Sequence, residues 1–265
     1  MRTIAHLSDL HFGRVNDRVL ASLLDDLETC NPDLIAVSGD LTQRASRKQF
    51  EDAKAFLISL AWPMVVVPGN HDVPLLNPVG RFAKPLGRYK HHFSGFPDPY
   101  YTDDKMMVVG ISTARPIFWR TGSLPPSVKR TSQGLFYDAG PDTMKIVVAH
   151  HSFMPPQKRR IPLAFDMAGR MAHLLRNEKP DILLAGHFHK SFHCLAGPDS
   201  ETGKILVIHA GTAVSNRLRK EQNAFNLVHV EKNRVTVDVR AFNNDIFNSI
   251  AINSFVRRGG VWNPE

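Results

Sequence analysis

Residues able to bind metal ions recur in this sequence wherever an apolar, strand-like run ends. They are aspartate, asparagine and histidine side chains, in chain order Asp9, His11, Asp40, Asn70, His71, Asp72, His150, His187 and His189. Carboxylate and amide oxygens mixed with imidazole nitrogens suit Mn, Fe, Co, Ni or Zn better than Ca or Mg, which favour all-oxygen shells. The residue types therefore predict a site for transition-metal ions.

Most of these residues are candidate metal ligands, namely Asp9, His11, Asp40, Asn70, His150, His187 and His189. That set is too large for one tetrahedral ion and suits two ions that share a carboxylate. Asp40 is the candidate for the shared carboxylate. Two ions about 3.5–4 Å apart can clamp the attacking and leaving oxygens of a phosphoryl transfer. They also lower the pKa of a water that they share, so that hydroxide is available for attack. The predicted chemistry is metal-dependent hydrolysis of a phosphate ester.

His71 and Asp72 are the candidate catalytic residues beside this ligand set. His71 follows Asn70 in a tight turn, so its ring is expected to face the substrate rather than a metal ion. An imidazole there would protonate the leaving alkoxide or hold the charge that builds on the phosphoryl oxygens. Asp72 would accept a hydrogen bond from the ring and fix its tautomer. The alternative is that His71 is a loop residue without a role.

Several further residues carry weaker signals. Surface arginines are common, so Arg14, Arg44 and Arg217 are only candidate phosphate contacts, and His151 is a candidate for orienting a neighbouring ligand. An irregular segment contains further polar or aromatic residues that are candidate substrate contacts, namely Arg115, Trp119, Arg120 and Lys129. Trp119 is better explained as a side chain that pins its own loop.

The strand-like runs that precede the ligands are the elements that must position them. These runs cover residues 3–8, 34–38, 64–67, 145–149 and 181–185. Ligands of α/β sheets bind just beyond the carboxyl ends of the strands. Since each of these runs ends in aspartate, asparagine or histidine, the sequence predicts one shared site.

Helical patterns alternate with the early strands, and strand patterns dominate the late part of the chain. Apolar residues at three-to-four spacing predict helices over 17–29, after Ser46, and over 165–177. Later strands are predicted over 205–209, 224–230 and 235–239, with a hairpin loop at 231–233. Residues 73–104 have no sustained period and are expected to form loop with short helical pieces, a wall over the site, and residues 115–142 are expected to be irregular. This order predicts a mixed α/β fold with one mixed sheet or two packed sheets and outer helices.

Length and composition limit the class of protein. The chain of 265 residues fits one domain over 1–265. It shows no apolar stretch long enough to span a bilayer, no signal segment and only two cysteines, which together predict a cytoplasmic protein. The net charge of +8 favours anionic partners, but the basic residues are scattered, which argues against a nucleic-acid track.

The motifs taken together resemble those of the calcineurin-like metallophosphoesterase superfamily. In order along residues 9–189 they are Asp9-Leu10-His11, Gly39-Asp40, Gly69-Asn70-His71-Asp72, His150 and Gly186-His187-Phe188-His189. The remainder of the chain is similar to the bacterial branch that contains class III cyclic nucleotide phosphodiesterases. This resemblance implies a four-layer αββα sandwich of two mixed sheets flanked by helices. It also implies that His71 is the catalytic histidine.

The resemblance further implies two metal half-sites. One comprises Asp9, His11, Asp40 and His189, and the other comprises Asp40, Asn70, His150 and His187. Mn and Fe are the expected divalent ions, with Zn, Co or Ni as alternatives. The expected function is hydrolysis of small phosphodiesters, with cyclic nucleotides as the first substrate class to test. The sequence does not decide between a monomer and a homodimer.

Three alternative functions remain at this point. One is a phosphomonoesterase or a nucleotide-sugar pyrophosphatase of lipid A synthesis on the same scaffold. Another is a nuclease, although the chain has little room for a separate DNA-capping domain. The last is a metal-bearing scaffold that binds a partner without chemistry, against which the full ligand set and His71 argue.

Overall fold

The computed structural model describes residues 1–75, 77–93, 99–117, 122–123, 134–151, 177–196, 205–219 and 221–265. The predicted helix over 165–177 lies outside these residues except for its last position. Trp119, Arg120 and Lys129 also lie outside them.

The first sheet contains seven strands in the order β13-β12-β11-β10-β1-β2-β3. Their bounds are β1 (Arg2–Leu7), β2 (Leu34–Val37), β3 (Met64–Val66), β10 (Ala224–Glu231), β11 (Arg234–Asn243), β12 (Ile246–Arg258) and β13 (Val261–Pro264). β1, β2 and β3 run parallel, whereas β10 pairs with β1 in the antiparallel sense. The sheet is therefore mixed, and its parallel part carries the first three motifs.

The second sheet contains six strands in the order β4-β5-β6-β7-β9-β8. Their bounds are β4 (Tyr100–Thr102), β5 (Met106–Ile111), β6 (Met144–Ala149), β7 (Ile182–Ala185), β8 (Phe192–Ala196) and β9 (Ile205–His209). β5, β6, β7 and β9 are parallel, and the edge strands β4 and β8 pair antiparallel. The remaining two motifs follow β6 and β7.

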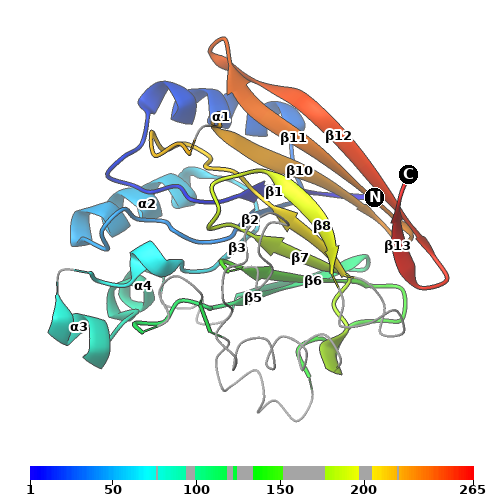
Figure 1. The fold of residues 1–265 in the computed structure, drawn as a ribbon, viewed down its shortest axis with the longest axis horizontal. Helices are drawn as coiled ribbons and strands as arrows, with labels where there is room; N and C mark the ends of the chain where they lie inside the picture. Colours follow the sequence, from blue (N-terminus) through cyan, green and yellow to red (C-terminus); the bar gives the residue numbers. More distant parts are fainter. Residues whose placement is uncertain are drawn as a thin grey trace.

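The two sheets pack face to face, as Figure 1 shows. Side chains from both sheets meet in one buried cluster, in which Ile4 and Val65 of the first sheet join Val108, Ile146 and Leu184 of the second. Burial of this apolar surface is the main force that holds the sheets together. The predicted mixed α/β sandwich of two sheets is thereby confirmed.

Helices α1 (Asp17–Cys30) and α2 (Arg47–Ser59) cover the outer face of the first sheet. Leu23 and Leu27 of α1 and Phe50 of α2 pack with Leu7 of β1. The Ser46 hydroxyl accepts a hydrogen bond from Gln49 N at 3.2 Å, which confirms the predicted helix start. None of the described helices is long and apolar enough to cross a membrane.

The segment after β3 contains short helices, as the sequence predicted. They are η1 (Asn70–Asp72), α3 (Pro78–Ala83) and α4 (Gly87–His92). The part of the chain after His189 was expected to be β-structure, but β8, β12 and β13 were not delimited within it, and β4 lies in a segment expected to be loop. Over much of its length β12 is exposed on both faces, so it lacks the apolar–polar alternation that marks a half-buried strand.

Candidate metal centre

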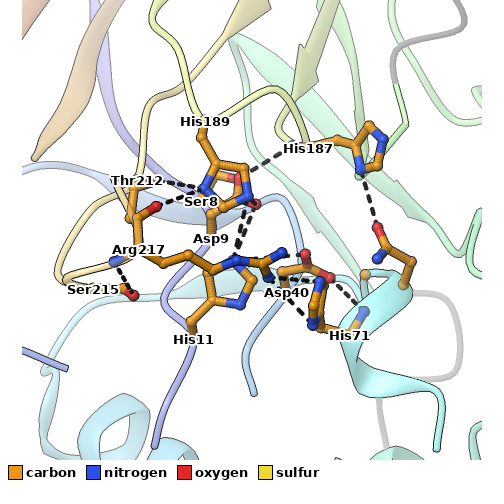
Figure 2. Close-up of polar contacts among 12 residues, drawn as sticks. Ser8, Asp9, His11, Asp40, His71, His187, His189, Thr212, Ser215 and Arg217 are labelled. Atoms are coloured by element: carbon orange, nitrogen blue, oxygen red, sulfur yellow. Dashed lines mark hydrogen bonds and ion pairs between the residues drawn. The ribbon is translucent and has the colours of Figure 1, made fainter. Parts of the chain in front are cut away.

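The structure brings all seven candidate ligands together where the carboxyl ends of both sheets meet. They come from the turns after β1, β2 and β3 of the first sheet and after β6 and β7 of the second. The shared site expected at strand ends is thus formed between two sheets instead of along one edge. Figure 2 shows most of these side chains converging.

One group within the site consists of Asp9, His11, Asp40 and His189. Their ligand atoms all lie within 4.8 Å of one another, and all four residues are buried. His189 Nε2 is 3.2 Å from Asp9 Oδ1, and His11 Nε2 is 3.6 Å from the same oxygen. This group has the composition of the first expected half-site.

A second group surrounds the amide of Asn70. Asn70 Oδ1 lies 3.1 Å from His150 Nε2 and 3.0 Å from His187 Nδ1. The carboxylate of Asp40 connects the two groups, because its Oδ1 is 3.5 Å from His150 Nε2 and its Oδ2 is 3.8 Å from His11 Nε2. A carboxylate with one oxygen toward each group has the arrangement that a bridging ligand requires.

The turns that carry the ligands have unusual backbone conformations. φ is positive at Asp9 (52°), His11 (49°), Asp40 (54°), His187 (75°) and His189 (59°). Non-glycine residues rarely adopt this region, and such strain clusters at functional sites. Hydrogen bonds hold the turns, among them those from Asp9 N to Gly39 O at 3.0 Å and from His11 N to Asp40 O at 2.9 Å. No pattern in the sequence indicated this strain.

Two glycines allow the turns to approach each other closely. A Cβ on Gly39 would lie 2.7 Å from His150 Nδ1, and the residue has a φ of +94°. A Cβ on Gly69 would overlap Asp40 N and Oδ1 and lie 2.8 Å from Asp40 Cγ. The absence of a side chain at these positions lets the loops after β2, β3 and β6 close around one point.

We expect Gly69→Ala to lower phosphoesterase activity by at least about tenfold and the free energy of unfolding by about 1–3 kcal/mol, because overpacking must displace Asp40. Activity assays and denaturant unfolding would measure both. Gly140→Ala is the control, since its Cβ would meet only Thr143 Oγ1 at 3.2 Å. Full activity in Gly69→Ala would show that this close approach does not position Asp40.

Burial and mutual charge set the protonation of the site. Burial lowers the pKa of His187 to about 3 and that of His189 to about 4, so both rings are neutral and able to bind a metal. Burial also raises the pKa of the Asp40 carboxyl well above its usual value, and Asp9 adds to this effect. At Asp9 the surrounding histidines, His189 foremost, outweigh burial and hold the pKa well below its usual value.

A buried carboxylate oxygen without a hydrogen bond shows independently that the ligand atoms suit a metal ion. Asp9 Oδ1 is buried and accepts no hydrogen bond within the described part of the chain, although it faces Nε2 of both His11 and His189. Buried carboxylate oxygens without a partner are costly. A cation between these atoms would satisfy the oxygen, so the residues present fit the group that their chemistry implies.

The outer nitrogens of the ligand rings are held by the protein. His150 Nδ1 donates to Ser38 O at 2.8 Å. His189 Nδ1 lies 3.2 Å from Arg217 O and 2.8 Å from the Thr212 hydroxyl. Such contacts fix the ring orientation and point Nε2 toward the centre. Sequence reasoning missed Ser38 and Thr212, because serine and threonine near a motif carry no distinctive signal.

The predicted hydrogen bond between Asp72 and the His71 ring is wrong. The Asp72 carboxylate accepts instead from the backbone N–H groups of Leu41, Thr42 and Gly69, at 3.1, 2.9 and 2.8 Å. It therefore ties the turn after β2 to the turn after β3. The ring of His71 is oriented by a backbone group, since its Nδ1 donates to the carbonyl of Gln43 at 2.9 Å.

The weaker candidates separate in space. Arg44 and Arg217 line a cavity beside His71, whereas the side chain of Arg14 is exposed and does not line it. His151 is buried beside His187, with a ring-centroid distance of 4.7 Å, and its Nδ1 lies 2.8 Å from Thr113 Oγ1. Together with His150 and His187 it also forms a group of possible metal ligands, so its expected role of orienting a neighbouring ligand stays a prediction.

Two histidines buried outside the ligand set make stability depend on pH. Burial lowers the pKa of His6 and of His209 to about 3, against about 6.5 in an unfolded chain. The unfolded state therefore binds more protons between these values. Stability should be complete above about pH 6.5 and fall as the pH drops toward 3, by up to about 1.4 kcal/mol per pH unit for each histidine.

Chemical unfolding of protein with chelator, measured from pH 7.5 to 4.5, would check this expectation. His6→Gln should flatten the pH profile, and substitution of the exposed His91 by glutamine is the matched control. An unchanged slope in His6→Gln would contradict the assignment.

Comparisons with known proteins agree with the fold and the chemistry of the site. A family model described as calcineurin-like phosphoesterase matches residues 2–191. A glycerophosphodiester phosphodiesterase, GpdQ, of Enterobacter lignolyticus is 32% identical over 80 residues, covering 26% of this chain and 29% of that protein. A probable cyclic nucleotide phosphodiesterase of Synechococcus sp. is 27% identical over 123 residues, covering 43% of this chain and 45% of that protein. The matched segments thus span less than half of either relative.

Solved structures extend the similarity to almost the whole chain. Purple acid phosphatase PPD1 from yellow lupin matches with a TM-score of 0.63 and 13% identity, over 97% of this chain and 54% of that one. A dimetal phosphatase from Danio rerio matches with a TM-score of 0.60 and 13% identity, over 94% of this chain and 99% of that one. At these identities the comparison establishes a shared fold.

Proposed function

Since this chain belongs to the calcineurin-like phosphoesterase family, we propose that it hydrolyses small phosphodiesters with the help of two divalent metal ions. The observation that carries the proposal is the carboxylate of Asp40, which faces one ligand group with each of its oxygens. A diester is placed before a monoester because both curated relatives are named as phosphodiesterases. Cyclic nucleotides are the first class to test, since one of those relatives is a probable cyclic nucleotide phosphodiesterase.

The residues that would hold the ions divide as the two groups do. Asp9, His11, Asp40 and His189 would hold one ion, and Asp40, Asn70, His150 and His187 the other. When bound, such ions polarise the phosphoryl oxygens and lower the pKa of water. Mn and Fe are the ions we place first, with Zn, Co or Ni as alternatives.

His71 is the residue that we assign to the reacting phosphate. Its backbone N–H donates to Asp40 Oδ1 at 2.7 Å, which fixes the residue beside the proposed bridge. Burial lowers the pKa of the ring to about 3, so the ring is neutral near pH 7. The negative charge of a bound phosphate would raise that pKa. A proton on Nε2, which requires that Arg217 Nη1 release this nitrogen, would then pass to the leaving oxygen.

Hydrolysis of bis(p-nitrophenyl) phosphate by the manganese-loaded protein tests the proposal. Rates on p-nitrophenyl phosphate, a cyclic nucleotide and a nucleotide sugar would separate a diesterase from a phosphomonoesterase or pyrophosphatase. Binding to DNA that weakens steeply with salt would favour the nuclease alternative. Metal binding without turnover of any ester would leave only the scaffold alternative.

A further inference from the structure

A cavity of about 130 Å³ adjoins the candidate metal centre at Asn70 and His71. Three arginines, Arg44, Arg81 and Arg217, contribute to its wall. Among the described residues no carboxylate lines the cavity, although the neighbouring ligand groups contain Asp9 and Asp40. Arginines that line a cavity without an acidic partner create a positive potential suited to an anion.

The three arginines differ in what their side chains already bind. Arg81 Nη1 donates to Pro74 O at 3.2 Å and Nη2 donates to Pro116 O, so this guanidinium holds two backbone segments together. Arg44 and Arg217 form no ion pair with the carboxylates that the structure describes. The positive charge available to a ligand therefore comes from these two residues.

Arg217 lies closest to the reacting side of the site. Its Nη1 donates to His71 Nε2 at 2.6 Å, and Figure 2 shows the side chain reaching from its loop to His71. A guanidinium has five N–H donors, so most remain for a ligand. Burial lowers the pKa of Arg217, and the charges of Arg219 and Arg44 add to this effect against those of Asp40 and Asp9.

The loop that carries Arg217 is firmly held. Arg217 N donates to Ser215 Oγ at 3.1 Å, and Asn223 Nδ2 donates to Ser215 O at 2.8 Å. Ser215 also forms a β-bridge with Val15. A guanidinium on such a support is pre-organised, which reduces the entropy lost when it binds an anion.

We propose that Arg217, with Arg44, forms a subsite for a second anionic group of the substrate, beside the phosphate that reacts. The inference rests on the proposed function. Planar guanidinium groups bind carboxylates and phosphates through paired hydrogen bonds. The preferred substrates are then phosphodiesters or diphosphates with a second negative charge nearby. A simple cyclic nucleotide has a single charge and leaves the subsite unused.

Equilibrium binding is the appropriate test, because Arg217 also contacts His71 and its loss would alter the rate by a second route. The probes are methylphosphonate, phosphonoacetate and 3-phosphonopropionate, which share one phosphonate and differ in whether and where they have a carboxylate. Their Kd values would be measured by calorimetry on the metal-loaded protein. The variants are Arg217→Met, Arg217→Lys and Arg219→Met.

The wild-type protein should bind one of the carboxylated probes at least about tenfold more tightly than methylphosphonate, the effect of one good charge-assisted pair. Arg217→Met should abolish this preference, and Arg217→Lys should retain part of it. Arg219→Met is the matched control, since Arg219 is exposed on the same loop and does not line the cavity. It should keep the preference, while melting temperatures show that each variant is folded.

Three results would overturn the subsite. They are the absence of a preference in the wild-type protein, equal weakening of all three probes in Arg217→Met, and an equal loss in Arg219→Met. If bis(p-nitrophenyl) phosphate is still hydrolysed, the proposed function survives any of them. A clear preference without hydrolysis of any ester would instead retain the subsite and reject the function. Failure of the wild-type protein to bind any probe, together with failure to hydrolyse any ester, would reject both.

Discussion

Asp40→Asn should lower phosphoesterase activity by about a thousandfold or more. The substitution keeps the size of the side chain and an oxygen for the His71 N–H, but it removes the charge that both ligand groups face. Two metal ions supply several kcal/mol of stabilisation to the transition state, and about 4 kcal/mol corresponds to a thousandfold in rate. Elemental analysis should show the metal content falling from two ions per chain to one or fewer.

The loss should not come from unfolding. Burial raises the pKa of Asp40 well above its usual value, which means that the folded protein disfavours the charged form. A neutral asparagine, which also tolerates a positive φ, should leave the metal-free protein at least as stable. Asp26→Asn is the control, because Asp26 is also a largely buried aspartate but pairs with Arg240, away from the ligand groups. Wild-type activity with two bound metals in Asp40→Asn would refute the bridging assignment.

His71→Ala should lower activity by about 10²–10⁴-fold without loss of metal, which is the usual range for a general acid or base. The backbone N–H that donates to Asp40 remains, and the His71 ring meets the ring of His11 edge-on, at 4.9 Å between centroids. Steady-state kinetics and metal analysis on the same preparation would check both parts.

The leaving group separates two roles for His71. p-Nitrophenolate leaves without a proton, whereas an alkoxide needs one. If the ring acts as a general acid, the substitution should harm an alkyl diester far more than bis(p-nitrophenyl) phosphate. Equal loss on both would assign it to charge stabilisation, and a loss of metal together with activity would make His71 part of the metal-binding framework.

The convergence of the candidate ligands could be predicted from the sequence because each lies at a strand end. Parallel strands bring their carboxyl ends to one edge, so Asp9 and Asp40 had to be neighbours once β1 and β2 paired. That His150 faces them from a second sheet did not follow from spacing, since nothing local sets how two sheets pack. The family resemblance supplied that step.

The details around the ligands were less predictable for a physical reason. Asp72 was expected to bind the ring of His71, its neighbour in sequence, yet it accepts backbone N–H groups from residues such as Leu41, far along the chain. Contacts of this kind depend on tertiary structure alone. The long strand β12 escaped prediction for the opposite reason, since its exposed stretch hides the period that marks a strand.

The left-handed backbone at Asp9, His11, Asp40, His187 and His189 has an evolutionary consequence. A non-glycine residue in this conformation costs roughly 1 kcal/mol or more of backbone strain, which glycine would not have. Under selection for heat resistance alone, in medium without metal, lineages should drift toward residues that relieve this strain and still fill the buried space, and so lose the enzyme while keeping the fold. The persistence of aspartate and histidine there would then mark lineages in which hydrolysis still matters to the cell.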